Sequence, residues 1–498
     1  MHNVCDRTRC TVNMGMVTLA AIRSVPMATT YIRGGTVVSP TGCQDLDVLI
    51  DGERIAALVD PELAPFDDPD RTFDHVLEAK GKYVIPGGVD AHTHMEMPFG
   101  GTVASDTFET GTRAAAFGGT TTIIDFAIQR QGERVQDTLA AWHAKARGNC
   151  AVDYGFHQIL GGVDTDALKA MDELVAEGVT SFKLFMAYPG VYYSDDGQIL
   201  RAMQQCAGNG ALTMMHAENG IAIDQLVAQH IERGETSPYY HGVSRPWELE
   251  EEATHRAIML AKITGAPLYV VHVSAKQAME QIAGARGSGA NVFAETCPQY
   301  LYLSLEEQLA APGFEGAKWV CSTPLRSHEE GHQEELWRYI RTGDVATVST
   351  DHCPFCFKGQ KEMGLGDFSK IPNGMSGVEH RIDLMYQGVV NGKLSLQRWV
   401  DVCATTPARM FGLYPRKGIV SPGADADVVI YDPDGRTSIG FEKNHHSNVD
   451  HSTWEGFEVE GCVQTVLSRG TIVVDRGRYL GRKGHGVFLK RGLSQYLI

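Results

Sequence analysis

Two histidines separated by one residue, His92 and His94, end an apolar run that reads VIPGGVDAHTH. In a β-strand, residues two positions apart project from the same face, so both imidazoles would face one side of a sheet. This spacing suits the ligation of a single metal ion. Two histidines alone are weak support for a metal site, because buried histidines with satisfied hydrogen bonds are common.

A lysine in the middle of a second apolar run needs a separate explanation. Lys183 lies within SFKLFMAY, a run that has the length and composition of a buried strand and contains no acidic residue. Burying an unpaired ammonium costs on the order of several kcal/mol. The run alone leaves two interpretations open: either the lysine reaches solvent from the end of a strand, or its amine has a special chemical role.

Further potential ligands end three more apolar runs. The runs ALTMMHAE, PLYVVHVS and VATVSTDH carry His216, His272 and Asp351 at or near their ends. Each histidine alone is more simply explained as a core residue, but so many metal-binding groups at the ends of runs are hard to obtain by accident. The sequence therefore predicts a joint metal site that comprises His92, His94, Lys183, His216, His272 and Asp351.

The apolar runs also predict the fold that positions these ligands. Most of them are separated by a helix-length amphipathic segment such as TDALKAMDELVAEG. Continuous apolar strands with helical crossovers form parallel sheets that are covered on both faces, and eight such units predict a (β/α)8 TIM-like barrel. Active sites in this fold lie at the C-terminal ends of the strands. The eight runs are VIPGGVDAHTH, TTTIIDF, VDYGFHQIL, SFKLFMAY, ALTMMHAE, PLYVVHVS, NVFAETCPQYL and VATVSTDH.

Short β-rich segments with glycine turns flank the barrel on both sides. SRGTIVVDRG near the C-terminus echoes IRGGTVVSPTG near the N-terminus, so the two regions are expected to share one sheet. We therefore expect a smaller β-sandwich domain built from residues 27–84 and 412–480, a metal-dependent hydrolase barrel at 85–411, and a C-terminal tail at 481–498. Residues 1–26 fit either a targeting peptide or translation from a start codon upstream of the fold.

Composition and charge narrow the class of partner. The chain has 498 residues, 43% of them hydrophobic, and a net charge of -17 from scattered acidic residues. This charge argues against nucleic acid or an anionic membrane as partner and favours a small molecule. The 11 cysteines are irregularly spaced, as expected for reduced thiols in a cytoplasmic protein, and no apolar run reaches transmembrane length.

The motifs together resemble the cyclic amidohydrolases, most closely the dihydropyrimidinases and hydantoinases. The resemblance implies two Zn²⁺ ions bridged by Lys183 after its amine has been carboxylated to a carbamate. It places His92, His94 and Asp351 on one zinc, and His216 and His272 on the other. The matching segments, which run from about Tyr31 to Arg491, are GGVDAHTHMEMPFGG, SFKLFMAY, MMHAEN, VVHVS, CSTPLR, STDHC and GDFSKIPNGMSGVEHR.

The same resemblance assigns roles around the metals. Asp351 would move the proton during hydrolysis, and Tyr188 would stabilise the oxyanion, although a tyrosine at a strand end is more often a packing residue. Ser322 and Asn373 would hold the imide edge of the substrate, largely through backbone groups. The resemblance further implies a homotetramer, with the tail at 481–498 as a candidate contact between subunits.

Glu96 bears on the substrate class. Dihydroorotases carry an arginine for the substrate carboxylate at this position, so a glutamate here disfavours an anionic ring. We expect a neutral 5,6-dihydropyrimidine that is opened to an N-carbamoyl β-amino acid. The alternatives are a hydantoinase or allantoinase that acts on another neutral cyclic ureide, and a non-catalytic scaffolding relative, which the complete ligand set disfavours. The pair Cys353 and Cys356 is expected to belong to an ordinary loop.

Overall fold

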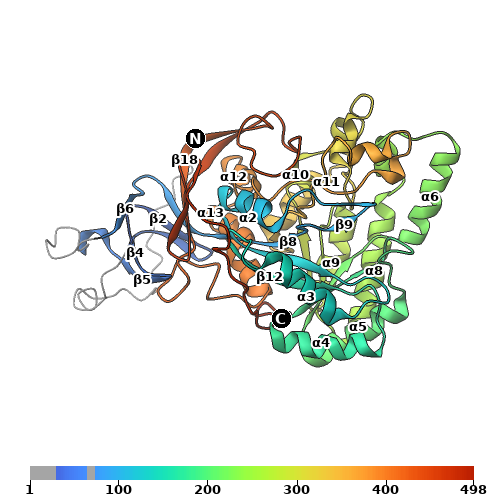
Figure 1. The fold of residues 1–498 in the computed structure, drawn as a ribbon, viewed down its shortest axis with the longest axis horizontal. Helices are drawn as coiled ribbons and strands as arrows, with labels where there is room; N and C mark the ends of the chain where they lie inside the picture. Colours follow the sequence, from blue (N-terminus) through green and yellow to red (C-terminus); the bar gives the residue numbers. More distant parts are fainter. Residues whose placement is uncertain (1–29, 64–72, 498) are drawn as a thin grey trace.

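A helix-covered barrel and two β layers at one end of it make up the protein (Figure 1). The computed structural model describes residues 30–63 and 73–497, so the segment 1–26 lies outside the described residues. No helix in the described part of the chain combines the length and apolar character needed to cross a bilayer.

Eight parallel strands form the barrel in chain order, and the predicted fold class is confirmed. Each strand pairs in parallel with the next one along the chain. A parallel bridge between Thr93 and His352 joins the end of the first strand to the segment after the last and closes the ring. The strands are β8 (Gly88–Thr93), β11 (Thr120–Ile128), β12 (Asp153–Ile159), β13 (Ser181–Phe185), β14 (Leu212–His216), β15 (Leu268–Val270), β16 (Val292–Thr296) and β17 (Val345–Val348).

Helices fill the crossovers between these strands. The segment TDALKAMDELVAEG forms α4 (Thr165–Glu177), whose first turn is capped by the Asp164 side chain and whose end is a left-handed Gly178. Its buried residues recur at helical spacing and face the barrel. The other long helices are α2 (Phe108–Phe117), α3 (Val135–Ala146), α5 (Asp196–Asn209), α6 (Gly220–Glu232), α8 (Trp247–Thr264), α9 (Lys276–Gly287), α11 (His332–Thr342) and α12 (Arg381–Val390).

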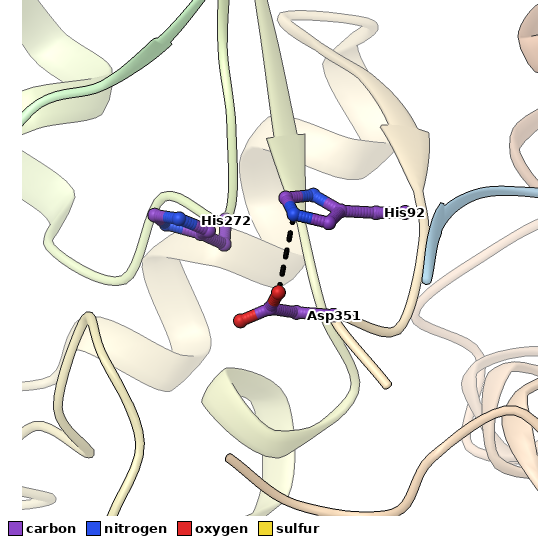
Figure 2. A group of neighbouring side chains, drawn as sticks. All are labelled: His92, His272 and Asp351. Carbon is purple, nitrogen blue, oxygen red and sulfur yellow. Dashed lines mark ion pairs between the residues drawn. The ribbon is translucent and has the colours of Figure 1, made fainter. Parts of the chain in front are cut away.

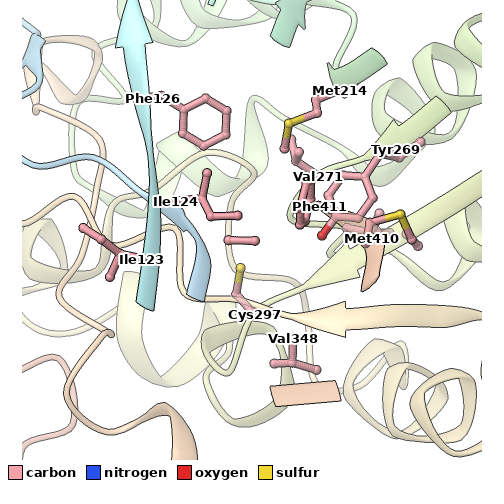
Figure 3. Packing of buried hydrophobic residues seen from close by; sticks show 14 of the residues in the cluster. Ile123, Ile124, Phe126, Met214, Tyr269, Val271, Cys297, Val348, Met410 and Phe411 are labelled. Carbon is pink, nitrogen blue, oxygen red and sulfur yellow. The ribbon is translucent and has the colours of Figure 1, made fainter. Parts of the chain in front are cut away.

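Apolar side chains fill the interior of the barrel (Figure 3). Phe126 of β11, Met214 of β14 and Tyr269 of β15 belong to one buried cluster. Phe411, which follows α14 (Thr406–Met410), packs its ring 5.3 Å from that of Tyr269. The barrel is therefore a packed core rather than a pore, and its chemistry is confined to the strand ends.

The two ends of the chain build the β layers together, as the repeated motif predicts. A seven-stranded sheet of order β21-β20-β19-β18-β7-β2-β3 contains β7 (Tyr83–Pro86) beside β18 (Val428–Ile439) and β19 (Phe457–Ser468). A four-stranded sheet of order β5-β4-β1-β6 packs on it. The remaining strands are β1 (Thr30–Arg33), β2 (Thr36–Ser39), β3 (Gly42–Asp45), β4 (Asp47–Asp51), β5 (Arg54–Val59), β6 (His75–Glu78), β20 (Thr471–Asp475) and β21 (Arg478–Tyr479).

Strand β18 shows how the seven-stranded sheet connects the two cores. Val428 and Ile430 belong to the apolar cluster between the sheets, whereas Val429 and Tyr431 belong to the cluster of the barrel. Successive side chains of a strand point to opposite faces, so one strand serves both cores. Apolar packing of β18 thereby holds the small domain against the barrel.

The C-terminal tail packs on its own barrel. The Leu489 amide donates to the Tyr154 carbonyl and the Arg491 amide to the Gly178 carbonyl. The Arg491 side chain is buried and donates to Ser181 Oγ at 2.8 Å. These contacts give the tail a role within one chain. Its contact with a second subunit, and the homotetramer itself, stay predictions.

Candidate active site

All nine predicted site residues lie together at the C-terminal end of the barrel. One cavity is lined by most of them, and His92, which is not part of this lining, contacts Lys183. The residues come from six different strand ends or the loops that follow them, so the closed barrel is what unites them. The predicted residues that line the cavity are His94, Lys183, Tyr188, His216, His272, Ser322, Asp351 and Asn373.

Imidazole nitrogens and a carboxylate oxygen that could bind a metal ion lie close together at the centre of this site (Figure 2). Asp351 Oδ1 lies 3.1 Å from His92 Nε2 and 3.1 Å from His94 Nε2. Ligand atoms of His92, His272 and Asp351 all lie within 4.8 Å of one another. Burial lowers the pKa of His94 to about 3, so its imidazole is neutral and available as a ligand.

A buried glutamate orients the first of these histidines. Glu295 on β16 accepts a hydrogen bond from His92 Nδ1 at 2.5 Å, which leaves the Nε2 lone pair directed at the centre of the site. The same carboxylate accepts the His272 backbone amide at 3.1 Å and the Tyr269 hydroxyl at 2.9 Å. Carboxylates that hold the second ring nitrogen are typical of metal-binding histidines.

A second buried glutamate, Glu218, orients the imidazole of His216. Its Nε2 lies 2.7 Å from Glu218 Oε2, and both side chains are buried. Since Nε2 donates to the carboxylate, Nδ1 carries the lone pair, and the ring packs 4.6 Å from that of His272. Sequence analysis missed both Glu218 and Glu295. The available signal was their position: Glu218 follows His216 by two residues in MMHAEN, and Glu295 lies at the end of the seventh run.

Lys183 is buried without a carboxylate partner. In the described part of the chain, the hydrogen-bond partner of its Nζ is His92 Nε2 at 2.9 Å, and the rings of Phe126 and Phe185 lie 4.4 and 5.0 Å away. Burial lowers the pKa of Lys183 to about 8. The interpretation in which the lysine reaches solvent is therefore wrong.

The backbone is strained at the site. Tyr188, His272 and Asp351 have φ values of 61°, 39° and 52°, in the left-handed region that residues with a side chain rarely adopt. Such conformations cost on the order of 1–3 kcal/mol each and cluster where function requires them. Here each one follows a barrel strand and turns a polar side chain into the cavity.

Tyr188, Ser322 and Asn373 form one hydrogen-bonded group. The side chains of Ser322 and Asn373 both bond to the Tyr188 hydroxyl, and Asn373 Nδ2 donates to Ser322 Oγ at 2.8 Å. Burial raises the pKa of Tyr188, so the hydroxyl keeps its proton at neutral pH and can donate it. The packing alternative for Tyr188 does not account for these polar contacts.

The structure corrects the argument about Glu96. Its carboxylate accepts the Phe108 amide at the start of α2 at 3.3 Å, and it does not line the cavity. Repulsion of an anionic substrate by Glu96 is therefore not a feature of this site. What remains is that no arginine is found among the lining residues, whose apolar members are Met97, Phe99, Phe185 and Tyr192, together with Cys353.

Comparisons with known proteins agree with a hydrolase barrel. The amidohydrolase family model matches residues 83–473. A D-hydantoinase from Streptomyces coelicolor is 62% identical over 94% of this chain and 99% of its own length. The crystal structure of a dihydropyrimidinase from Brevibacillus agri has a TM-score of 0.90 at 45% identity, over 93% of this chain and 99% of that one. An L-hydantoinase (dihydropyrimidinase) from Arthrobacter aurescens has a TM-score of 0.82 at 30% identity, over 93% and 100%.

The fold and these relationships thus define a barrel enzyme of the hydrolase class. The chain belongs to the amidohydrolase family, and it is a cyclic amidohydrolase of the hydantoinase/dihydropyrimidinase type. The scaffolding alternative is excluded by these relationships.

Proposed function

We propose that the enzyme holds two Zn²⁺ ions and uses them to open neutral cyclic ureides. The observation that carries the proposal is the convergence of four histidines and Asp351 around a buried lysine that forms no ion pair with a carboxylate of the described residues. The donor set fits metal, because the Nε2 atoms of His92 and His94 both lie 3.1 Å from Asp351 Oδ1, and ligand atoms of His92, His272 and Asp351 lie within 4.8 Å of one another. His92, His94 and Asp351 would hold one ion, and His216 and His272 the other.

Lys183 would bridge the ions as a carbamate. Its Nζ, in the neutral form that a lowered pKa favours, attacks the carbon of CO₂ and loses a proton, which gives an N-carboxylated lysine. This change replaces a cation by an anion with two oxygen ligands. The resulting negative charge offsets part of the charge of the two ions, which makes burial of the group tolerable.

The residues around the metals would provide proton transfer, stabilisation of the oxyanion and binding of the ring. When bound, a metal pair lowers the pKa of water and polarises a carbonyl group. Asp351 Oδ1 contacts the Nε2 atoms of both His92 and His94. The Asp351 carboxylate would take the proton from the attacking water and give it to the leaving nitrogen. Tyr188 would donate to the developing oxyanion. Backbone groups near Ser322 and Asn373 would meet the imide edge of the ring.

Glu218 provides a test of the metal assignment. We expect Glu218→Gln to weaken binding of one of the two ions by about 10–100-fold, because the His216 ring loses its anionic partner. The measurement is metal content after titration with a chelator. The matched control is Glu235→Gln, which removes a carboxylate 2.6 Å from His230 on the surface. Equal metal retention in the two variants would contradict the placement of an ion at His216.

The substrate class follows from the lining of the cavity. Apolar and aromatic walls without an arginine favour an uncharged ring. The sequence ranks dihydrouracil first, with opening to an N-carbamoyl β-amino acid. A second candidate, 5-monosubstituted hydantoins of D configuration, is favoured by the 62% identity to a protein named D-hydantoinase, against 30% to an L-hydantoinase.

The test is a comparison of kcat/KM across ring types. We expect turnover of dihydrouracil and of D-5-monosubstituted hydantoins, with the ratio deciding between the two candidates, and weaker turnover of allantoin. Dihydroorotate should react at least about 100-fold more slowly, because its carboxylate finds no arginine and must lose water. A preference for dihydroorotate would overturn the proposal.

A further inference from the structure

A second buried lysine, Lys361, lies outside the metal-binding residues. It begins a short 3-10 helix (Lys361–Gly364) and its side chain is completely buried. Its Nζ donates to three backbone carbonyls: Val320 at 2.9 Å, Pro372 at 2.7 Å and Gly374 at 2.8 Å. Among the described residues, the hydrogen bonds of this side chain go to peptide oxygens and not to a carboxylate. Burial lowers the pKa of Lys361 to about 7, but three peptide oxygens within hydrogen-bond distance accept three protons, which only the ammonium form carries.

The three carbonyls belong to the two segments that carry Ser322 and Asn373. Residues 320–322 and 372–374 lie side by side, since the Gly374 amide donates to the Val320 carbonyl at 2.9 Å. Asn373 Nδ2 donates across the same gap to Ser322 Oγ at 2.8 Å. One ammonium thus ties together both segments that meet the substrate.

The packing leaves these segments little freedom to move independently. A Cβ atom on Gly374 would lie 2.1 Å from the Cys353 carbonyl oxygen, so the backbone passes in close contact with the segment after Asp351. The position of Asn373 is therefore determined by its neighbours on both sides. Without the ammonium, the Val320 carbonyl would keep the Gly374 amide as a donor, whereas the Pro372 and Gly374 carbonyls would lose the donor that Lys361 provides. The segments could satisfy these two buried carbonyls only by shifting or by admitting water.

The contact with Pro372 has an electronic consequence. The Pro372 carbonyl and the Asn373 amide belong to the same peptide group. A charged donor on the carbonyl oxygen polarises that group and makes its N–H a stronger donor. Lys361 therefore both fixes the Asn373 amide in space and increases its capacity to bind an acceptor on a ring.

We propose that Lys361 is a positioning residue for substrate recognition, which holds and polarises the Ser322/Asn373 edge of the site. The inference rests on the proposed function, because it takes this edge to be where the imide of the ring binds. Lys361 does not touch the metal-binding residues or line the cavity. Its effect should consequently appear in substrate binding rather than in the chemical step.

The experiment uses the full-length, metal-loaded enzyme and the better of the two substrates, dihydrouracil or a D-hydantoin. We expect Lys361→Met to raise KM by about 10–100-fold, with kcat changed by less than about threefold, as for a lost charge-assisted contact in binding. Metal content should stay at the wild-type level. Lys361→Gln, which keeps two N–H donors without the charge, should give a smaller increase and provides the test if the methionine variant does not fold.

A double-mutant cycle with Asn373→Ala separates positioning from general stability. If Lys361 acts through this edge, the effects of the two substitutions on KM should be clearly non-additive. The matched control is Lys417→Met, another buried lysine, which pairs with Asp153 and Asp427 at 2.7 Å. It should lower Tm and leave KM unchanged.

Two results would overturn the inference: an additive cycle, or a loss of kcat and metal in Lys361→Met with KM unaffected. Failure of the proposed function is distinguishable from both, because it would appear in the wild-type enzyme as absent turnover of all neutral ureides.

Discussion

Replacing Lys183 with alanine is expected to remove most of the bound metal and to lower kcat/KM by about 10³-fold or more. The side chain lines the same cavity as His216 and His272, and its Nζ is 2.9 Å from His92 Nε2. Without the proposed bridging carbamate, neither of the two proposed ions would keep its full ligand set. Metal assistance supplies several kcal/mol of catalysis, and each 1.36 kcal/mol corresponds to about tenfold in rate. Metal analysis and steady-state kinetics measure the two losses.

A rescue experiment makes this prediction specific. A short carboxylic acid such as acetate or propionate could occupy the space left by the lysine and supply two oxygen ligands. We therefore expect partial recovery of activity and metal with added acid in Lys183→Ala, and none in a Lys417→Ala control. Intact-protein mass should show one CO₂ added to the wild-type chain. An unmodified lysine in a fully active enzyme with two metals would refute the carbamate.

The fold could be predicted from the sequence because its signals are local and repeated. Each barrel strand is a continuous apolar run. The ends of a helix such as α4 are indicated by its capping residues, Asp164 before the first turn and Gly178 after the last. The repeated glycine-turn motif indicated that the two ends of the chain share one sheet, and the structure joins them there through the pairing of β7 with β18, more than 300 positions apart. In each case the pattern reflects burial on one or both faces of an element.

The site was predictable only in part, for a physical reason. Its ligands lie at strand ends, where barrel geometry brings them together irrespective of their separation in sequence. Residues that act through another group carry no such signal. Glu295 and Glu218 are recognised only by the ring nitrogens they hold, and Lys361 only by the three carbonyls around its Nζ. Glu96 is a residue for which the motif predicted a role that the structure does not support. Its place in the motif suggested contact with the substrate, but its carboxylate binds the Phe108 amide at the start of α2.

Replacing Asp351 with asparagine is expected to lower kcat by about 10²–10⁴-fold, the usual contribution of a positioned general acid–base group. Burial tends to raise the pKa of Asp351, but the imidazoles of His92 and His94 outweigh it and hold that pKa well below its ordinary value. The carboxylate is therefore ionised at neutral pH and ready to accept a proton. An asparagine carbonyl could still coordinate a metal, but its amide cannot relay a proton.

The metal content of each preparation decides how a loss of activity is interpreted. If Asp351→Asn binds two ions per chain and is slow, the missing function is proton transfer, because the ligand set has survived. KM should then change little, since the groups proposed to bind the ring, Tyr188, Ser322 and Asn373, are untouched. If the variant loses metal, reconstitution with excess zinc should restore occupancy without restoring kcat. A metal-replete variant with a near-normal rate would exclude Asp351 as the proton carrier and leave it as a ligand alone.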